Sequence, residues 1–246
     1  MYKGNKIVVV LPAYNAASTL ERTVEEIPME LVDDLILCDD ASTDETVSLA
    51  KRLGINEILQ HQINRGYGAN QKSLYDKALS LGADIIIMLH PDYQYTPRLI
   101  GDMVRIIGDD VYPVVLGSRI LGNGALKGGM PVYKYISNRI LTLIQNMLIG
   151  SKLSEFHTGY RAYHSDVLKK INNTRNSDDF VFDNQVLSQI IYHGYDIGEV
   201  TCPTHYFDDA SSISFTRSVR YGIGVLRVSV MHFLQRTGLG NFSLYS

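Results

Sequence analysis

The sequence predicts an α/β fold in which a mainly parallel central sheet is flanked by helices on both faces. Over residues 6–120, short apolar runs alternate with amphipathic segments, and helix-start and helix-stop signals fall between the runs. Polar side chains appear abruptly where several of the runs end. This alternation is typical of parallel sheets, because two parallel strands need a long connection that is usually a helix.

Five apolar runs are the predicted strands of this region, at residues 6–11, 34–38, 57–60, 84–89 and 113–117. Ser18-Thr19-Leu20-Glu21 and Ser42-Thr43-Asp44-Glu45 fit the capping-box pattern, which predicts helix starts near residues 19 and 43. Predicted helix ends carry a glycine, since glycine readily adopts the backbone conformation that closes a helix. These glycines are Gly54, Gly82 and Gly108.

The chain changes character after residue 120. Residues 121–130 contain four glycines and are predicted to form a loop. Apolar residues then recur every three or four positions over residues 132–148, which predicts a long helix. A further helix is expected over residues 183–193, ended by Gly194, and a last strand over residues 197–200.

Composition limits the compartment and the class of partner. The 246 residues suit one large α/β domain, and the net charge of −3 provides no basic field that would attract nucleic acid. Cys38 lies in an apolar run, so it and Cys202 are expected to be free thiols in a reducing compartment. The run at residues 7–11 is too short for a signal peptide, and no stretch of about 18 uncharged apolar residues predicts a membrane span. We therefore expect a cytoplasmic protein.

The C-terminal tail, residues 210–246, has an unusual charge pattern. It contains no Asp or Glu, its apolar residues recur at helical spacing, and its charged side chains are Arg217, Arg220, Arg227 and Arg236. A basic amphipathic helix of this kind can lie on an anionic membrane surface. Alternatively, the helix packs on the domain and its arginines are solvated or paired.

The segment Leu89-His90-Pro91-Asp92-Tyr93-Gln94 ends the fourth predicted strand. His90, Asp92 and Gln94 alternate, so an extended backbone would place their nitrogen and oxygen atoms on one side. In open α/β sheets, ligands bind just beyond the carboxyl ends of strands. The segment therefore suits a divalent ion that holds a diphosphate, although His-Pro-Asp is equally good β-turn chemistry.

Three other polar segments would meet this one at the same edge of the sheet. They are Pro12-Ala13-Tyr14-Asn15, Asp39-Asp40-Ala41-Ser42-Thr43-Asp44 and Asn64-Arg65-Gly66-Tyr67-Gly68-Ala69-Asn70. Together the four resemble the family 2 glycosyltransferases, which have the nucleotide-sugar-binding fold called GT-A. Gly117-Ser118-Arg119 and Ser154-Glu155-Phe156-His157-Thr158-Gly159-Tyr160-Arg161 are similar to segments of the polyprenyl-phosphate sugar transferase branch.

The resemblance covers most of the chain and implies its organisation. We expect a single GT-A domain over residues 1–209, with a nucleotide-binding half at 1–120 and an acceptor half at 121–209. The basic tail at 210–246 follows it.

The resemblance also implies the donor and metal ligands. The expected donor-binding residues are Pro12, Tyr14, Asp40, Gly68, His90 and Arg119. Asp92, Gln94 and His90 are the expected ligands of Mg²⁺ or Mn²⁺. The family usually has Asp-x-Asp at this strand end, and His90 replaces the first Asp. His90 could ligate metal, which would favour Mn²⁺ over Mg²⁺, or bind the donor phosphate.

The acceptor side is implied by the same branch of the family. The expected acceptor-binding residues are Arg119, Lys134, Ser137, Arg139 and Arg161, and the expected catalytic residues are Asp92, Glu155 and Arg161. A guanidinium fork matches phosphate oxygens, but Arg161 could instead form a structural ion pair with Glu155 or a nearby Asp. If the acceptor is a hydroxyl group, Glu155, Asp179 or Asp183 could be the base.

The implied activity is inverting transfer of a sugar from a nucleotide-diphosphate sugar to a polyprenyl-phosphate-type lipid, at the cytoplasmic face of the membrane. Two alternatives are a polysaccharide glycosyltransferase with a sugar hydroxyl acceptor and a nucleotide-sugar-binding protein without catalysis. Neither the sugar nor the base of the donor is specified by these motifs.

Overall fold

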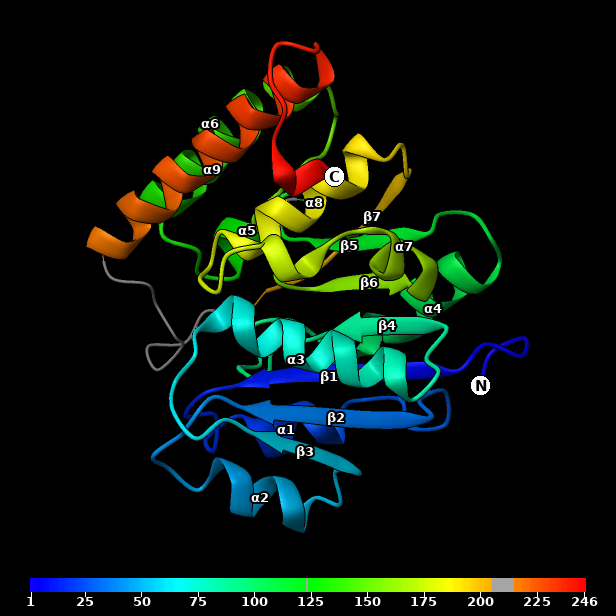
Figure 1. Cartoon of the computed structure of the whole chain (residues 1–246). Helices are drawn as coiled ribbons and strands as arrows, with labels where there is room; N and C mark the ends of the chain where they lie inside the picture. Colours follow the sequence, from blue (N-terminus) through cyan, green and yellow to red (C-terminus); the bar gives the residue numbers. More distant parts are fainter. Residues whose placement is uncertain (123, 205–214) are drawn as a thin grey trace.

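The computed structural model describes residues 1–122, 124–204 and 215–246. Its centre is a seven-stranded sheet with the order β3-β2-β1-β4-β6-β5-β7 (Figure 1). The strands are β1 Ile7–Ala13, β2 Asp34–Asp39, β3 Glu57–Gln60, β4 Ile85–Met88, β5 Val114–Ser118, β6 Arg161–His164 and β7 Ile197–Thr201. Every neighbouring pair is parallel except those of β6, which is antiparallel to β4 and β5. The predicted fold class is therefore confirmed.

Helices cover both faces of the sheet (Figure 1). The helices of the described residues are α1 Leu20–Glu25, α2 Thr46–Arg52, α3 Tyr67–Ser80, α4 Ile100–Gly108, α5 Gly124–Lys127, α6 Val132–Ile149, α7 Ser165–Lys170, α8 Phe182–Tyr192 and α9 Phe215–Arg236, of which α6 and α9 form a pair beyond the sheet. Alternate residues of β1 enter two separate cores, since side chains of a strand point to opposite faces in turn. Val9 packs with α1, α2 and α4, whereas Val8 packs with α3, α7 and α8.

Two local predictions were wrong. Helix α2 begins at Thr46 rather than near residue 43, and neither α1 nor α2 has a side-chain cap. Instead, Ser42 Oγ accepts a hydrogen bond from Asn15 N–H, and Asp44 Oδ2 accepts one from Ala17 N–H. The polar residues of the expected capping box therefore join the turn after β2 to the turn after β1, which fixes the edge where the site lies.

Strand β6 was not predicted, because Arg161–His164 is short and lacks an apolar run. The loop expected over residues 121–130 contains one short helix, α5. Both cysteines are free and buried, as expected.

The basic tail forms α9, which lies beside α6 and also contacts α8 (Figure 1). Val225 and Val228 of α9 are buried, so the helix packs on the domain, as the second interpretation of the tail predicted. The expected boundary between residues 209 and 210 lies outside the described residues. Among the described helices, none combines the length and apolarity needed to cross a membrane.

Candidate active site

Three polar segments follow neighbouring strands at one edge of the sheet. Strand β1 lies between β2 and β4, and all three run in the same direction (Figure 1). Ala13 is paired with Asp39, and the Leu89 N–H donates to the Val10 carbonyl at 3.1 Å. Tyr14, Asp40 and His90 therefore leave adjacent strands at this edge, as the sequence predicted. The Tyr14 side chain is 55% exposed there.

Asp40 has a different role from the predicted contact with the donor. Its Oδ1 accepts hydrogen bonds from Arg65 N–H at 2.9 Å and lies 2.6 Å from His61 Nδ1. Its Oδ2 accepts from Gly66 N–H at 2.9 Å. The buried Asp40 carboxylate thus organises the loop that leads into α3, and both of its oxygens accept hydrogen bonds from that loop.

The adjacent acid, Asp39, has the open oxygen that Asp40 lacks. Asp39 Oδ2 accepts from Ser42 N–H at 3.0 Å, but its buried Oδ1 has no hydrogen-bond partner among the described residues. A buried acceptor without a donor is costly, and a ligand N–H would satisfy it. The sequence motif contains both acids and does not reveal which of the two carboxylates accepts the backbone N–H groups of the neighbouring loop.

Gly68 also differs from its predicted role. A Cβ added at Gly68 would lie 2.3 Å from the Ser177 carbonyl oxygen, and the Gly68 N–H donates to the Asp178 carbonyl at 2.8 Å. Gly66, with φ +96°, is equally close to Asp178. The close approach that these glycines allow is to the segment before α8 and not to a donor.

His90 lies at the end of a hydrogen-bonded series that crosses three elements. His90 Nε2 is 2.9 Å from the Tyr67 hydroxyl, which donates to Asp183 Oδ2 at 2.8 Å. Asp183 Oδ1 accepts from Gln71 Nε2 at 3.1 Å. Burial lowers the pKa of His90, although the nearby Asp92 and Asp183 oppose this shift. Asp183 is thus engaged with α3 and is not placed as a free base.

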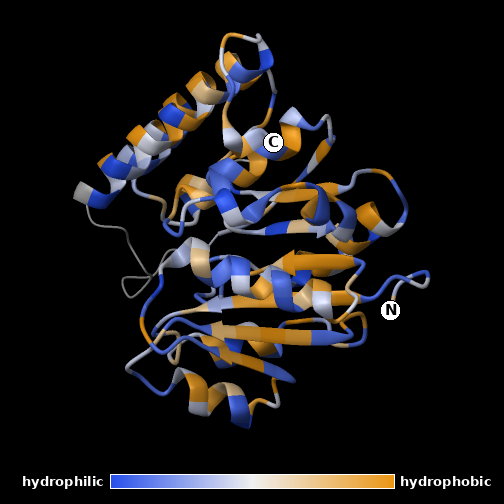
Figure 2. Cartoon of the chain, in the orientation of Figure 1, coloured by the Kyte–Doolittle hydropathy of each residue, from blue (hydrophilic) through white to orange (hydrophobic). Residues whose placement is uncertain are grey.

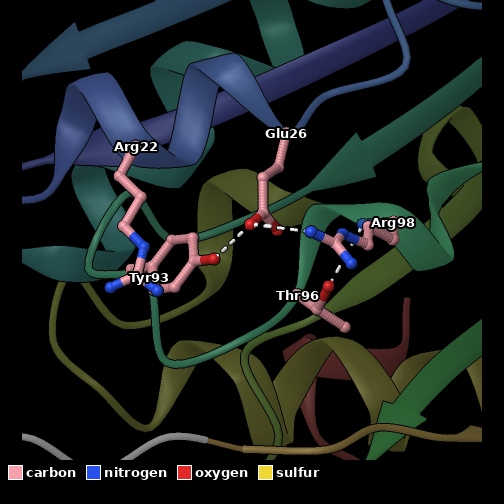
Figure 3. A pocket seen from close by; sticks show the side chains of 5 residues that line it. All are labelled: Arg22, Glu26, Tyr93, Thr96 and Arg98. Carbon is pink, nitrogen blue, oxygen red and sulfur yellow. Dashed lines mark hydrogen bonds and ion pairs between the residues drawn. The ribbon is translucent and has the colours of Figure 1, made fainter.

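Asp92 and Gln94 lie in a turn that is anchored from the opposite side. Tyr93 has φ +56°, and its side chain points away from the edge of the sheet, toward α1. There its hydroxyl donates to Glu26, and the Arg22 guanidinium lies 3.8 Å from its ring centroid (Figure 3). These residues line a cavity of about 220 Å³ on the α1 side. The turn interpretation is therefore confirmed, with Tyr93 as the anchor of the turn that carries Asp92, and the ligand interpretation stays a prediction.

The residues at this strand end fit a divalent ion. Asp92 Oδ1 accepts from Gln94 N–H at 3.0 Å, which leaves its second oxygen without a hydrogen bond to the described residues. No cluster of three or more His, Cys, Asp or Glu side chains occurs in the described parts of the chain. Mg²⁺ and similar ions are often held by one or two protein groups together with substrate phosphates, and this donor set matches that pattern.

Arg119 and Glu155 form a buried ion pair. The backbone N–H and the Nε of Arg119 each donate to Glu155 at 2.9 Å, and Nη2 donates to the same carboxylate and to the His157 carbonyl. Asn138 Nδ2 donates to Glu155 at 2.7 Å. Burial raises the pKa of Glu155, but the Arg119 charge and hydrogen bonds outweigh it, so the pKa lies below its ordinary value. The contacts of Glu155 therefore favour a role as the ion-pair partner of Arg119 over the predicted role as a base.

Arg161 does not reach an acceptor. Its side chain is fully buried and donates to the carbonyls of Thr158 and Asp183 at 2.8 Å and of Phe156 at 3.2 Å. Its Nη1 also lies 3.6 Å from Asp183 Oδ1. This arrangement favours the alternative interpretation of Arg161 as a structural ion pair over the predicted phosphate contact.

The other predicted acceptor residues lie on α6. Ser137 and Arg139 are exposed and Lys134 is half-buried. Arg139 Nη1 lies 3.4 Å from the Ser154 carbonyl, directly before Glu155. Asp179, the remaining candidate base, accepts a hydrogen bond from Phe180 N–H at the surface. These side chains are accessible, and their roles stay predictions.

Comparisons with known proteins identify the family and the fold of the chain. A profile described as glycosyl transferase family 2 matches residues 8–172. The UDP-N-acetylglucosamine–dolichyl-phosphate N-acetylglucosaminyltransferase of Methanococcus voltae is 27% identical over 216 residues, which cover 81% of this chain and 86% of that protein. The polyprenol monophosphomannose synthase of Mycolicibacterium smegmatis is 22% identical over 202 residues, or 79% and 76% of the two chains.

A similar solved structure is glucosyl-3-phosphoglycerate synthase from Mycobacterium tuberculosis with UDP. It superimposes with a TM-score of 0.70 at 18% identity and covers 97% of this chain and 82% of its own. Other structures of that synthase contain Mn²⁺ with UDP-glucose or Mg²⁺ with UDP. The structural likeness establishes the GT-A fold, and the profile match covers well over half of the sequence. The chain therefore belongs to glycosyl transferase family 2 and is a glycosyltransferase.

Proposed function

We propose that this glycosyltransferase moves a sugar, with inversion at the anomeric carbon, from a nucleotide-diphosphate sugar to a polyprenyl-phosphate-type lipid. The proposal depends chiefly on one observation, the state of the carboxylates that could act as a base. Of the three candidate bases, Glu155 is paired with Arg119, Asp183 accepts hydrogen bonds from Tyr67 and Gln71, and Asp179 lies at the surface. A lipid phosphate is already ionised and attacks without a base, whereas a sugar hydroxyl needs one.

The leaving group is the nucleoside diphosphate, and its charge must be stabilised as the glycosidic bond breaks. Asp92, Gln94 and His90 would hold a divalent ion here, and such an ion neutralises developing negative charge on phosphate oxygens. The fixed turn contributes positioning, because the Tyr93 anchor on α1 limits the movement of Asp92. Arg119 is held at the same edge by Glu155, and its contact with the donor is part of the proposal.

The donor base would lie beside Tyr14 and Pro12. The exposed Tyr14 ring offers a face for stacking. Asp39 follows in the next strand, and its unpartnered Oδ1 would accept a hydrogen bond from a ring N–H of the base. We therefore transfer to Asp39 the base-binding role that the sequence suggested for Asp40.

The face formed by α6 and α9 supports a lipid acceptor. Helix α6 has three polar residues buried, Asn138, Thr142 and Gln145, while six of its large apolar residues are 51–71% exposed. These exposed residues are Val132, Tyr133, Ile136, Ile140, Leu143 and Met147. A water-facing helix normally has the opposite arrangement, and Figure 2 shows apolar residues along both helices of this pair.

Charge on the same face favours an anionic surface. Neither α6 nor α9 contains Asp or Glu, and Arg217, Arg220 and Arg227 of α9 are exposed. Each basic residue near an anionic leaflet contributes about 1 kcal/mol to binding. We propose that α6 and α9 rest on the cytoplasmic face of the membrane, where the lipid phosphate would be presented to the site.

A matched acceptor pair tests the proposed reaction. Purified protein would be given Mn²⁺, a labelled nucleotide sugar and either a polyprenyl phosphate or the polyprenol of the same length. We expect label in the lipid only with the phosphate, because the alcohol needs a base to remove its proton. Transfer to the alcohol or to a free sugar, with none to the lipid phosphate, would contradict the proposal.

Vesicle flotation tests the membrane face. We expect the double variant Ile136→Ser, Leu143→Ser to float less well than wild type with vesicles that contain anionic lipid, since each change removes exposed apolar area. Val111→Ser is the matched control, because Val111 is 60% exposed in the segment between α4 and β5. If both variants float as well as wild type, the face formed by α6 and α9 does not bind the membrane.

A further inference from the structure

His90, Tyr67 and Asp183 come from three different elements and form a single hydrogen-bonded series. Tyr67 begins α3, Asp183 lies in the first turn of α8, and His90 follows β4. The Tyr67 oxygen is 2.9 Å from His90 Nε2 and 2.8 Å from Asp183 Oδ2. The series ends at the carboxyl end of β4, next to Asp92, the proposed metal ligand. The positions of the hydrogens in the series therefore decide which nitrogen of His90 is available to a metal ion.

The direction of each hydrogen bond follows from the donor inventory. An ionised carboxylate only accepts hydrogen bonds, so the single Tyr67 hydroxyl proton points to Asp183. Asp183 Oδ1 accepts a hydrogen bond from Gln71 Nε2 at 3.1 Å and lies 3.6 Å from Arg161 Nη1, so both neighbours on that side are donors. The Tyr67 hydroxyl lies 2.8 Å from Asp183 Oδ2 and donates its only proton there. The Tyr67 oxygen must therefore accept from His90, and Nε2 of His90 carries a hydrogen.

The imidazole ring is held in this orientation by packing as well. A Cβ added at Gly159 would lie 2.7 Å from His90 Nε2 and 2.9 Å from its Cδ2, so only glycine fits behind the ring. In the neutral ring a proton on Nε2 leaves a lone pair on Nδ1, and Nδ1 has no hydrogen-bond partner among the described residues.

We propose that Tyr67 and Asp183 are positioning residues that hold His90 as the neutral Nε2–H tautomer, so that Nδ1 is a nitrogen ligand for the divalent ion beside Asp92. The inference rests on the proposed metal-assisted transfer and assigns the role of the residue that replaces the family's first Asp. Ligating histidines commonly donate their other ring N–H to a fixed acceptor, which sets the tautomer. Here the fixed acceptor is a tyrosine that a buried carboxylate orients in turn.

Two measurements on the wild-type protein test this assignment directly. Histidine-selective ¹⁵N labelling and long-range ¹H–¹⁵N correlation spectra report which ring nitrogen carries the proton, and His90→Gln identifies the His90 signals among the seven histidines. We expect a protonated Nε2 and an unprotonated Nδ1. Pulsed EPR of the protein with Mn²⁺ and UDP, and again with GDP, should show ¹⁴N coupling from one imidazole that is absent in His90→Asp.

A matched pair of tyrosine variants tests the positioning role. Tyr67→Phe removes the acceptor of His90 Nε2–H, whereas Tyr75→Phe removes another buried hydroxyl of α3, one that donates to Gln71. Loss of an outer-shell partner typically weakens metal binding about 10–100-fold, so we expect a loss in this range for Mn²⁺ affinity with UDP in Tyr67→Phe and a small change in Tyr75→Phe. Unfolding curves of both variants monitor the fold.

Three outcomes would overturn the inference. They are a proton on Nδ1 in the wild-type spectra, an Mn²⁺ spectrum without nitrogen coupling, and unchanged Mn²⁺ affinity in a folded Tyr67→Phe protein. The proposed function fails separately, since a chain that binds Mn²⁺ through His90 yet transfers no sugar to lipid phosphate would refute the function alone. Conversely, transfer with an all-oxygen Mn²⁺ site would refute only the role of His90.

Discussion

Glu155→Gln distinguishes the two roles that Glu155 could have, ion-pair partner and general base. Glu155 is fully buried and accepts hydrogen bonds from the backbone N–H, Nε and Nη2 of Arg119 and from Asn138. A glutamine is uncharged and has one acceptor oxygen instead of two. At least one donor of Arg119 would then lose its acceptor, and the guanidinium would lose its counter-charge.

The magnitude follows from the burial of both partners. Neutralising one partner of a buried pair costs about 3–5 kcal/mol. The Arg119 side chain is 11% exposed, so water can partly solvate its unpaired charge. We therefore expect a loss of stability at the lower end of this range, about 3 kcal/mol. For a chain of this length, 1 kcal/mol shifts Tm by about 2–4 °C, so Tm should fall by about 6–12 °C.

Thermal unfolding followed by circular dichroism, with urea unfolding in parallel, measures this change. Glu30→Gln is the control, because Glu30 is exposed and a surface change of this kind shifts stability by less than about 0.5 kcal/mol. Transfer activity would be measured below the Tm of each variant. An unchanged Tm together with lost transfer would refute the ion-pair reasoning and identify Glu155 as a base.

Three further predictions concern the metal site and acid stability. Asp92→Ala should abolish transfer while Tm stays within about 1 °C, and normal turnover would exclude Asp92 as a ligand. His90→Asp should raise the ratio of Mg²⁺- to Mn²⁺-supported activity, since a hard oxygen replaces nitrogen; an unchanged ratio would count against ligation. Burial lowers the pKa of His157 to about 4 from 6.5, so the unfolded state binds a proton first as pH falls. The contribution of this residue to the free energy of unfolding is complete above pH 6.5 and falls by at most about 1.4 kcal/mol per pH unit toward pH 4. Urea unfolding at a series of pH values should therefore show that the free energy of unfolding falls less steeply with pH in His157→Gln than in wild type. An equally steep fall in the two proteins would contradict the assignment.

The parallel half of the fold was predictable because its signals are local. The apolar runs of β1, β2 and β4 are contiguous, and polar residues appear where each run ends. Strand β6 was not predictable in this way, because its four residues pair antiparallel with strands that lie far away in the sequence. The sequence suggested that Arg161 binds a ligand, because it does not reveal the partners that the fold provides. These partners are backbone carbonyls, which only the tertiary structure brings around the guanidinium group.

The site was predicted at the level of segments and less well at the level of atoms. Asp39 and Asp40 are equivalent by sequence, and only the fold places Arg65 and Gly66 against Asp40 and leaves an oxygen of Asp39 open. Likewise, the replacement of an Asp by His90 was visible, but Tyr67 and Asp183 lie 23 and 93 positions away along the chain. Hydrogen bonds between such distant residues decide which candidate atoms remain available to a ligand.

The central claim is that the sugar is transferred to a lipid phosphate by a metal-assisted site that contains Asp92. The most direct measurement incubates the protein with Mn²⁺, polyprenyl phosphate in anionic vesicles and a panel of radiolabelled nucleotide sugars, and then partitions the product between organic solvent and water. We predict that label from at least one donor enters the organic phase and that Asp92→Ala eliminates it. Label that remains in a water-soluble product, or a protein that binds a donor and transfers nothing, would contradict the claim.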